Sequence, residues 1–272
     1  MCKYSKWNNG LNIYFCSRII TDTHTHLYSE AFDDDRSEMI QRAIDANVKR
    51  FFIPAIDSTY TASMFQLEKD FPDYVFLMMG LHPTHVKENY KEELKHVEDQ
   101  LANRKFYAVG EIGIDLYWDK STLDIQIEAF RYQINLAKQY KLPIVIHCRE
   151  AFNEIFEVLE QEKSEDLFGI FHCFSGTLEQ AKQAISYNMK LGIGGVVTFK
   201  NGKIDQFINQ IDTKHIVLET DAPYLAPKPY RGKRNESLYI NKVLEKLSEL
   251  YQISEKELAE ITTENSKAIF GI

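Results

Sequence analysis

The sequence has 272 residues, of which 44% are hydrophobic, 12% aromatic and 26% charged. With only 12 Gly and 7 Pro, this composition excludes disordered, collagen-like and low-complexity chains. The net charge of −8, from 32 basic and 40 acidic residues, argues against a large basic surface that binds nucleic acid. Any nucleic-acid-binding site must therefore be small. No apolar run approaches the roughly 18 residues that a bilayer-spanning helix needs. We therefore expect a globular chain without a membrane partner.

The four cysteines are scattered and form no CxxC pair. Such a chain is expected to keep its thiols reduced, which favours a cytoplasmic location. Residues 1–17 are expected to be a polar N-terminal extension, because Asn8, Asn9 and Gly10 interrupt what would be the apolar part of a signal peptide. No linker divides the remainder, so the sequence predicts one domain over residues 18–272.

Eight short runs rich in β-branched or aromatic residues predict strands. In chain order they are 18–23, 50–55, 75–80, 106–111, 143–147, 168–173, 190–196 and 215–220. The segments between them carry apolar residues at helical spacing, for example around 39–44 and 130–137. Two further helical patterns follow the last strand, and the second opens with the capping box Ser254-x-x-Glu257.

The alternation of strands and helices predicts an α/β fold. Runs such as 51–53 and 144–146 are continuously apolar, as expected for a parallel sheet that is covered on both faces. Parallel neighbours need helical crossovers, and this chain supplies them. Eight repeats fit a closed TIM (β/α)8 barrel better than an open sheet. A doubly wound open sheet remains the alternative.

His24 and His26 are two residues apart, so on a strand both imidazoles point to the same side and can reach one metal ion. Alone this pair is a weak signal, because ordinary buried histidines explain it equally well. The context strengthens it, since metal-ligand side chains recur at or just after the carboxyl ends of predicted strands. The full set is His24, His26, Glu111, His147, His172 and Asp221. Barrels and open α/β sheets alike build their sites at that end.

Four imidazoles and two carboxylates exceed what one tetrahedral zinc site needs. Two divalent ions are the simpler interpretation; a bridging carboxylate would hold them about 3.5–4 Å apart with a shared hydroxide, which indicates hydrolysis. The mixed ligand set suits Zn²⁺, Mn²⁺ or Fe²⁺, and Mg²⁺ stays among the candidate ions. The chain shows neither a GxGxxG loop nor a GxSxG nucleophile elbow.

Seven stretches, in order, resemble the TatD family of metal-dependent deoxyribonucleases. They are 22–27 (DTHTHL), 80–83 (GLHP), 110–115 (GEIGID), 143–149 (PIVIHCR), 172–176 (HCFSG), 219–225 (ETDAPYL) and 231–236 (RGKRNE). The resemblance implies an amidohydrolase-like TIM barrel that hydrolyses DNA phosphodiester bonds, often as a 3′-to-5′ exonuclease, on DNA that is single-stranded or has a free 3′ end. It also implies two ion sites that share one carboxylate. His24, His26, Glu111 and Asp221 would hold one ion, and Glu111, His147 and His172 the other.

Glu111 and Asp221 are the expected catalytic residues, with Asp221 receiving or relaying a proton. The expected substrate-binding residues are His82, Arg149 and Arg234. Arg149 is equally consistent with an ion pair to a carboxylate. Arg234 belongs to a basic cluster with Lys228, Arg231 and Lys233 that is suited to phosphate, although a solvated loop explains these charges as well.

Three features depart from the family pattern or carry a second interpretation. Tyr28 stands where Asp or Asn commonly follows the His-x-His-Leu motif, and we expect it to alter substrate contacts at the barrel mouth. Tyr117 and Trp118 could stack on a base, but packing at the rim is the plainer expectation. The acidic run 33–35 is expected to support the start of a helix rather than to bind metal.

Two rival functions use the same residues. The same centre would also hydrolyse an ester, as in a D-aminoacyl-tRNA deacylase, in which case tRNA is the partner. A non-catalytic barrel could keep the ligands for stability or binding, although one structural ion would not need both clusters. The sequence does not set the oligomeric state.

Overall fold

Eight short parallel strands form the inner layer of the protein in a computed structural model that describes residues 19–272. They are β1 (Ile20–Asp22), β2 (Val48–Ile53), β3 (Val75–Leu77), β4 (Val109–Asp115), β5 (Ile144–Arg149), β6 (Gly169–Phe171), β7 (Met189–Ile193) and β8 (Ile216–Leu218). The extension expected at residues 1–17 lies outside the described residues.

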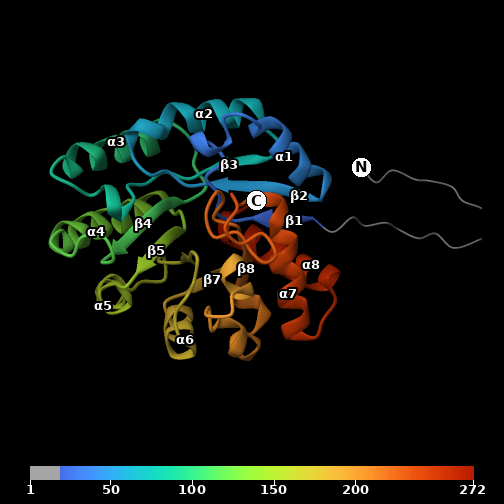
Figure 1. Cartoon of the computed structure of the whole chain (residues 1–272). Coiled ribbons are helices and arrows are strands. Elements are labelled where there is room, and N and C mark those ends of the chain that lie inside the picture. Colours follow the sequence, from blue (N-terminus) through green and yellow to red (C-terminus); the bar gives the residue numbers. More distant parts are fainter. Residues whose placement is uncertain (1–18) are drawn as a thin grey trace, which may run out of the picture.

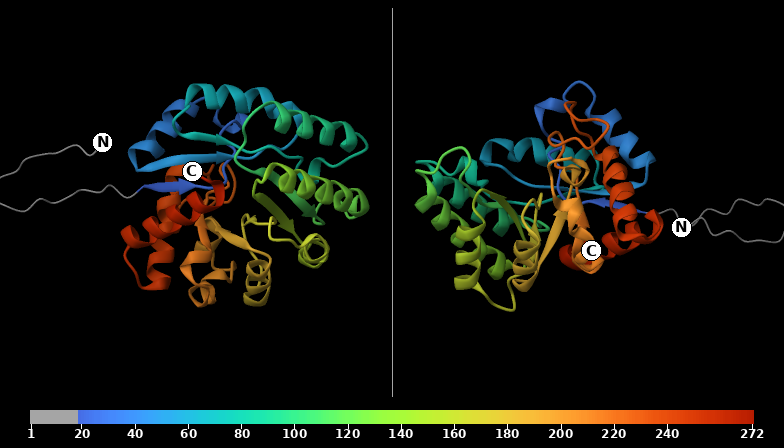
Figure 2. Two further views of the ribbon diagram at one scale, coloured as in Figure 1. Left: turned by 180° about the vertical axis from the view of Figure 1, so that it is seen from behind. Right: turned by 60° about the horizontal axis from the view of Figure 1, so that its bottom comes forward.

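Helices form the outer layer around these strands (Figures 1 and 2). They are α1 (Arg36–Asp45), α2 (Thr61–Asp70), α3 (Tyr90–Asn103), α4 (Leu123–Tyr140), α5 (Phe152–Glu162), α6 (Leu178–Ser186), α7 (Ile240–Tyr251) and α8 (Glu255–Phe270). Short 3-10 turns are η1 (Glu30–Phe32), η2 (Ser58–Tyr60), η3 (Pro83–His85), η4 (Gly195–Thr198), η5 (Ile204–Gln206), η6 (Ile208–Gln210), η7 (Thr213–His215) and η8 (Ser237–Tyr239).

Hydrogen bonds close the strands into a barrel. The strands pair in two parallel groups, β1-β2-β3 and β4-β5-β6-β7-β8. A parallel bridge between Met79 and Val109 joins the two groups after β3. At the other seam, the backbone N–H of Thr23 donates to the carbonyl of Leu218 over 3.0 Å. The predicted TIM barrel is therefore confirmed, and the open doubly wound sheet is excluded.

All eight predicted strands form, but each ends one to four residues away from its predicted end. β4 continues to Asp115 because it pairs with β5 as far as Arg149. The sequence predicted an earlier end, since glycine and polar residues interrupt the apolar run there. The strand predicted at 190–196 stops at Ile193, where the chain enters η4. Both helices predicted after the last strand form, and Ser254 Oγ accepts a hydrogen bond from the N–H of Glu257 at the start of α8.

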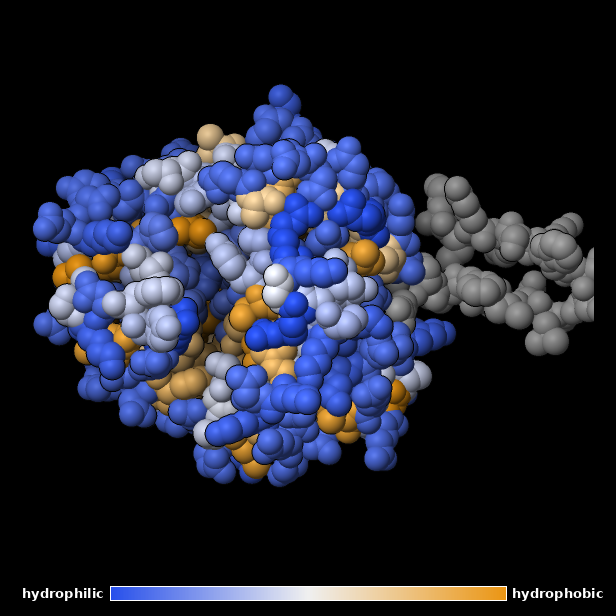
Figure 3. Space-filling view, viewed as in Figure 1, coloured by the Kyte–Doolittle hydropathy of each residue, from blue (hydrophilic) through white to orange (hydrophobic). Residues whose placement is uncertain are grey.

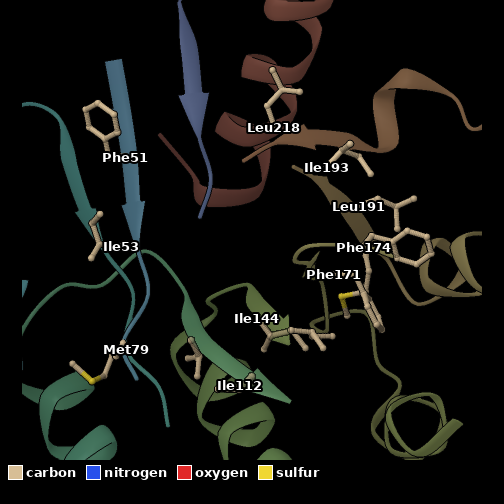
Figure 4. Packing of buried hydrophobic residues seen from close by; sticks show 14 of the residues in the cluster. Phe51, Ile53, Met79, Ile112, Ile144, Phe171, Phe174, Leu191, Ile193 and Leu218 are labelled. Atoms are coloured by element: carbon tan, nitrogen blue, oxygen red, sulfur yellow. The ribbon is translucent and has the colours of Figure 1, made fainter. Parts of the chain in front are cut away.

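Side chains on alternate strand positions fill two separate cores. The smaller core consists of Phe52, Met78, Ala108, Val145, Ile170, Val217, Ile269 and Phe270. The larger core packs strand residues such as Phe51 and Ile144 against the helices (Figure 4). Because side chains alternate along a strand, His147 shares the face of Val145, and His172 continues the face of Ile170. The smaller core therefore lies on the same side of the strands as these two histidines.

None of the helices in residues 19–272 has the length and hydropathy that crossing a bilayer requires. The face shown in Figure 3 is mostly hydrophilic, with small separate hydrophobic areas.

Candidate metal centre

The six predicted ligands converge at the carboxyl ends of the strands. His24 and His26 follow β1, His172 follows β6, and Asp221 follows β8. Glu111 lies inside β4 because that strand extends farther than its apolar pattern indicates. A buried carboxylate, Asp22, connects the end of β1 to the segment that follows β8. Its Oδ2 accepts hydrogen bonds from Thr220 Oγ1 and Ser237 Oγ, each over 2.6 Å.

One side of the centre joins two imidazoles and two carboxylates. The Nε2 atom of His24 lies 3.0 Å from Glu111 Oε2 and 3.3 Å from Nε2 of His26. His26 Nε2 lies 3.6 Å from the same Glu111 oxygen and 3.5 Å from Asp221 Oδ1. His24 Nε2 is 3.9 Å from Asp221 Oδ1. Four ligand atoms thus surround one small space.

The other oxygen of Glu111 faces a second group of imidazoles. Glu111 Oε1 lies 2.8 Å from His147 Nδ1 and 3.3 Å from His172 Nε2. His82 Nε2 approaches within 3.3 Å of both Glu111 Oε1 and His147 Nδ1. The structure therefore brings together all six predicted ligands and adds His82, which the sequence placed with the substrate-binding residues.

The hydrogen bonds of His82 identify which of its nitrogens carries the proton. Its Nδ1 accepts the backbone N–H of Thr84 over 3.2 Å. A neutral imidazole has one donor and one acceptor nitrogen, so Nε2 carries the proton and points to Glu111 as a donor. Burial lowers the pKa of His82 to about 4, which keeps the ring neutral. A protonated Nε2 can donate to an oxygen but cannot ligate a metal ion.

The ionic partners of the Glu111 carboxylate in the described residues are all histidines. Burial by itself would raise the pKa of this carboxyl, but the N–H of His82 and the imidazoles of His24 and His172 hold it well below its usual range. In the described part of the chain, no lysine or arginine pairs with Glu111. A buried carboxylate ringed by imidazole nitrogens is a donor set that fits a divalent cation of the zinc or manganese type.

Three ligand histidines have a partner on the ring nitrogen that faces away from Glu111. His147 Nε2 donates to Asp115 Oδ2 over 2.8 Å, and His172 Nδ1 lies 3.1 Å from Glu219 Oε1. His26 Nδ1 lies 3.0 Å from the hydroxyl of Tyr28. Such partners orient the ring that binds a metal ion.

The sequence did not assign roles to Asp115 and Glu219, although both lie in stretches of the TatD-like pattern. Asp115 is four residues beyond the expected end of its strand. The available signal was that residues 111 and 115 share one face of a strand that continues. The expectation for Tyr28 is corrected by the structure: its side chain is buried rather than at the mouth, and it bonds to His26. The reason is packing, because the phenol ring lies against Tyr60 with ring centroids 5.3 Å apart.

The two arginines predicted to bind substrate lie in different surroundings. Arg149, at the exposed end of β5, stacks its guanidinium 3.7 Å from the ring centroid of Tyr117. Arg234 is engaged in ion pairs, with 2.6 Å from Nη1 to Asp35 Oδ1 and 3.3 Å from Nη2 to Glu236 Oε1. In the described residues Arg149 has no carboxylate partner and could bind a ligand, whereas Arg234 already has two carboxylate partners.

Comparisons with known proteins agree with the motifs and the geometry. The family model for TatD related DNase matches residues 21–271. The uncharacterized metal-dependent hydrolase YabD of Bacillus subtilis is 41% identical over 256 residues, which cover 93% of this chain and 100% of YabD. The uncharacterized metal-dependent hydrolase TatD of Mycobacterium tuberculosis is 31% identical, with 93% of this chain and 98% of that protein covered.

A solved structure gives the same result. The crystal structure of YjjV, a TatD homolog from Escherichia coli K12, matches with a TM-score of 0.88 at 29% identity and covers 93% of this chain and 98% of that chain. The family match includes residues of all eight strands and every residue of the centre. The chain therefore belongs to the TatD-related DNase family and is a metal-dependent hydrolase.

Proposed function

We propose that the protein hydrolyses phosphodiester bonds of DNA, using two divalent ions held at this centre. The first ion would be held by His24, His26, Glu111 and Asp221. The second would be held by Glu111, His147 and His172. Zn²⁺, Mn²⁺ and Mg²⁺ are the candidate ions.

The position of Glu111 is the observation that carries this proposal. Its Oε2 lies 3.0 Å from His24 Nε2, while its Oε1 lies 2.8 Å from His147 Nδ1. A carboxylate whose two oxygens face separate imidazole groups has the geometry of a bridge between two ions. Two-metal centres of this kind serve hydrolytic displacement at phosphorus, which supports a phosphodiester as the substrate.

The residues around the bridge have distinct proposed roles. Bound divalent ions would supply Lewis acidity at the phosphoryl oxygen and lower the pKa of water. Asp221, whose side chain is 14% exposed against 2% for Glu111, would accept the proton of the attacking water. His82, with its proton on Nε2, would donate to an oxygen of the phosphate or of the leaving group.

Digestion of 5′-end-labelled single-stranded DNA tests the proposal. With Mn²⁺ or Zn²⁺ we expect progressive shortening from the 3′ end, which a chelator stops and added metal restores. Glu111→Ala and Asp221→Ala should each lower the rate by at least about 100-fold, because each removes a charged group from the reacting centre. Glu88→Ala, which removes an exposed carboxylate elsewhere, is the matched control and should keep full activity.

The same preparation should be offered a D-aminoacyl-tRNA. Deacylation of this tRNA with no cleavage of DNA by the metal-loaded protein would overturn the phosphodiesterase proposal in favour of ester hydrolysis. The proposed location is the cytoplasm, and the free thiols of Cys148 and Cys173 are consistent with a reducing compartment.

A further inference from the structure

Exposed aromatic side chains gather beside the metal centre. Of the seven large hydrophobic side chains that are exposed in the described residues, four follow the strands β4 and β8. They are Tyr117, Trp118, Tyr224 and Leu225. Trp118 is 71% exposed and Tyr117 is 49% exposed, so neither is packed into the rim as the sequence suggested. Large apolar groups that are left exposed together indicate an interaction site.

Arg149 adds a positive charge to this aromatic pair. Its guanidinium lies 3.7 Å from the ring centroid of Tyr117 and 5.5 Å from that of Trp118. No carboxylate in residues 19–272 forms an ion pair with it, since neighbouring Glu150 pairs with Lys120 at 4.0 Å. A guanidinium that is stacked on a ring keeps its N–H groups free along its edge, where they can bind phosphate oxygens.

Asp115 fixes the aromatic pair relative to the metal centre. Its Oδ2 accepts from His147 Nε2 over 2.8 Å. Its Oδ1 accepts from the backbone N–H of Tyr117 over 3.0 Å and from that of Trp118 over 3.4 Å. One carboxylate therefore holds both a proposed metal ligand and the turn that carries the rings, so their separation is set by a rigid group.

We propose that Tyr117, Trp118 and Arg149 form a docking site for one nucleotide of a single-stranded nucleic acid. An unpaired base stacks on the exposed indole of Trp118, and Arg149 binds a phosphate oxygen of the same strand. The inference rests on the proposed phosphodiesterase function and adds how the strand is held. The positive charge of Arg149 and the exposed rings match the two chemical features that every nucleotide offers, a phosphate and a π-face.

This arrangement would discriminate between single-stranded and duplex nucleic acid rather than between base sequences. Every base has a face that can stack, so an aromatic platform tolerates all four bases. A base inside a duplex is already stacked and paired, so it must separate from its partner before it reaches Trp118. The site should therefore favour single strands and frayed ends.

Trp118 reports on its own contact through fluorescence. The chain has two tryptophans, Trp7 and Trp118, so a Trp7→Phe background leaves one indole. We expect single-stranded oligonucleotides to quench its emission in the presence of a chelator, where hydrolysis cannot occur. An oligonucleotide of the same length in which all the nucleosides are abasic should quench much less. Equal quenching by both, or none by either, would overturn the stacking contact.

Kinetics give a second and independent readout. Activity on single-stranded DNA is divided by activity on methyl p-nitrophenyl phosphate, a diester without a base. Trp118→Ala should lower this ratio of kcat/KM values by roughly 5- to 100-fold, as expected for one lost base–aromatic stack. Tyr132→Ala, which removes an exposed ring from α4, is the matched control and should leave the ratio unchanged. An unchanged ratio in Trp118→Ala would contradict the inference.

The two proposals fail in different ways. If the wild-type protein cleaves DNA and the Trp118 variant keeps the wild-type ratio, the docking site is wrong while the phosphodiesterase function stands. If the metal-loaded wild type cleaves neither diester, the proposed function is wrong, and the quenching in chelator still decides whether the aromatic pair binds a single strand.

Discussion

At the scale of single residues, the proton on His26 is fixed by its neighbour. The hydroxyl of Tyr28 has one proton, which it donates to the carbonyl of Pro54 over 2.9 Å. The same oxygen can then only accept from His26 Nδ1, at 3.0 Å. The lone pair of His26 must therefore lie on Nε2, which faces Glu111 and Asp221.

Tyr28→Phe tests this control of the ring. The variant keeps the aromatic packing but leaves the Nδ1–H of His26 buried without an acceptor, so we expect metal affinity to fall about 10- to 100-fold. Competition with a chromogenic chelator measures the affinity. Tyr60→Phe, which removes a hydroxyl from the adjacent ring, should leave it unchanged. Equal affinities of Tyr28→Phe and the wild type would show that the hydroxyl does not orient His26.

Gly192 has no side chain, and the carboxylate of Glu219 occupies the space that a Cβ atom would take. A Cβ atom at this position would lie 2.1 Å from Glu219 Oε2, so a larger residue must displace the carboxylate. Glu219 lies 3.1 Å from His172 Nδ1. We therefore expect Gly192→Ala to weaken binding of the second ion about 10-fold or more and to lower the rate with it. Titration of the apoprotein with Mn²⁺ measures this change, and two undisturbed binding steps would contradict it.

At the scale of elements, the long connection after β8 is held to α1 by charge. Asp35 stands at the N-cap position of α1 but makes no capping hydrogen bond with its side chain. Its carboxylate instead accepts from Arg234 over 2.6 Å and 2.8 Å, and from Arg42 over 3.1 Å. The acidic run was expected to support the start of this helix by capping it, but Asp35 makes no capping hydrogen bond and instead anchors a distant loop.

The anchor makes part of the stability depend on pH. The hydrogen bonds from Arg234 lower the pKa of Asp35 to about 2, below the value of about 4 in an unfolded chain. A depressed pKa stabilises the folded state above pH 4, and this contribution is lost as the pH falls through about 2. Asp35→Asn should cost about 1 kcal/mol at pH 7, because the pair is partly exposed.

Urea unfolding at several pH values measures that contribution. The difference between the wild type and Asp35→Asn should shrink steadily below pH 4. Asp34→Asn, which alters an exposed neighbour, should differ little from the wild type at any pH. A difference for Asp35→Asn that stays constant down to pH 2 would contradict the assigned ion pair.

At the scale of the whole molecule, the sequence predicted those features that depend on residues close together in the chain. The eight strands followed from short apolar runs, and the position of the six proposed ligands followed from where those runs end. The strand end at Asp115 was missed because pairing with β5, rather than composition, extends β4. The partners of Arg234 were missed because Asp35 lies 199 residues away in the chain, and only the closed barrel brings them together.

Bound ions should stabilise the entire barrel, because their proposed ligands come from both ends of the chain. An ion that binds only the folded state adds about 2.7 kcal/mol to the free energy of unfolding at 100 times its Kd. We expect Zn²⁺ or Mn²⁺ to raise the Tm of the wild type and to do so far less in Glu111→Ala. Thermal unfolding with and without the metal measures this shift, and equal shifts in both proteins would place the ions elsewhere.

The number of ions bound per chain tests the bridging role of Glu111 most directly. Elemental analysis of the folded wild type, after equilibration with a buffered excess of Zn²⁺ or Mn²⁺ and removal of free metal, should give two ions per chain. Glu111→Ala should give fewer than two while its circular dichroism stays that of a folded barrel. A wild type that binds one ion or none would contradict the account.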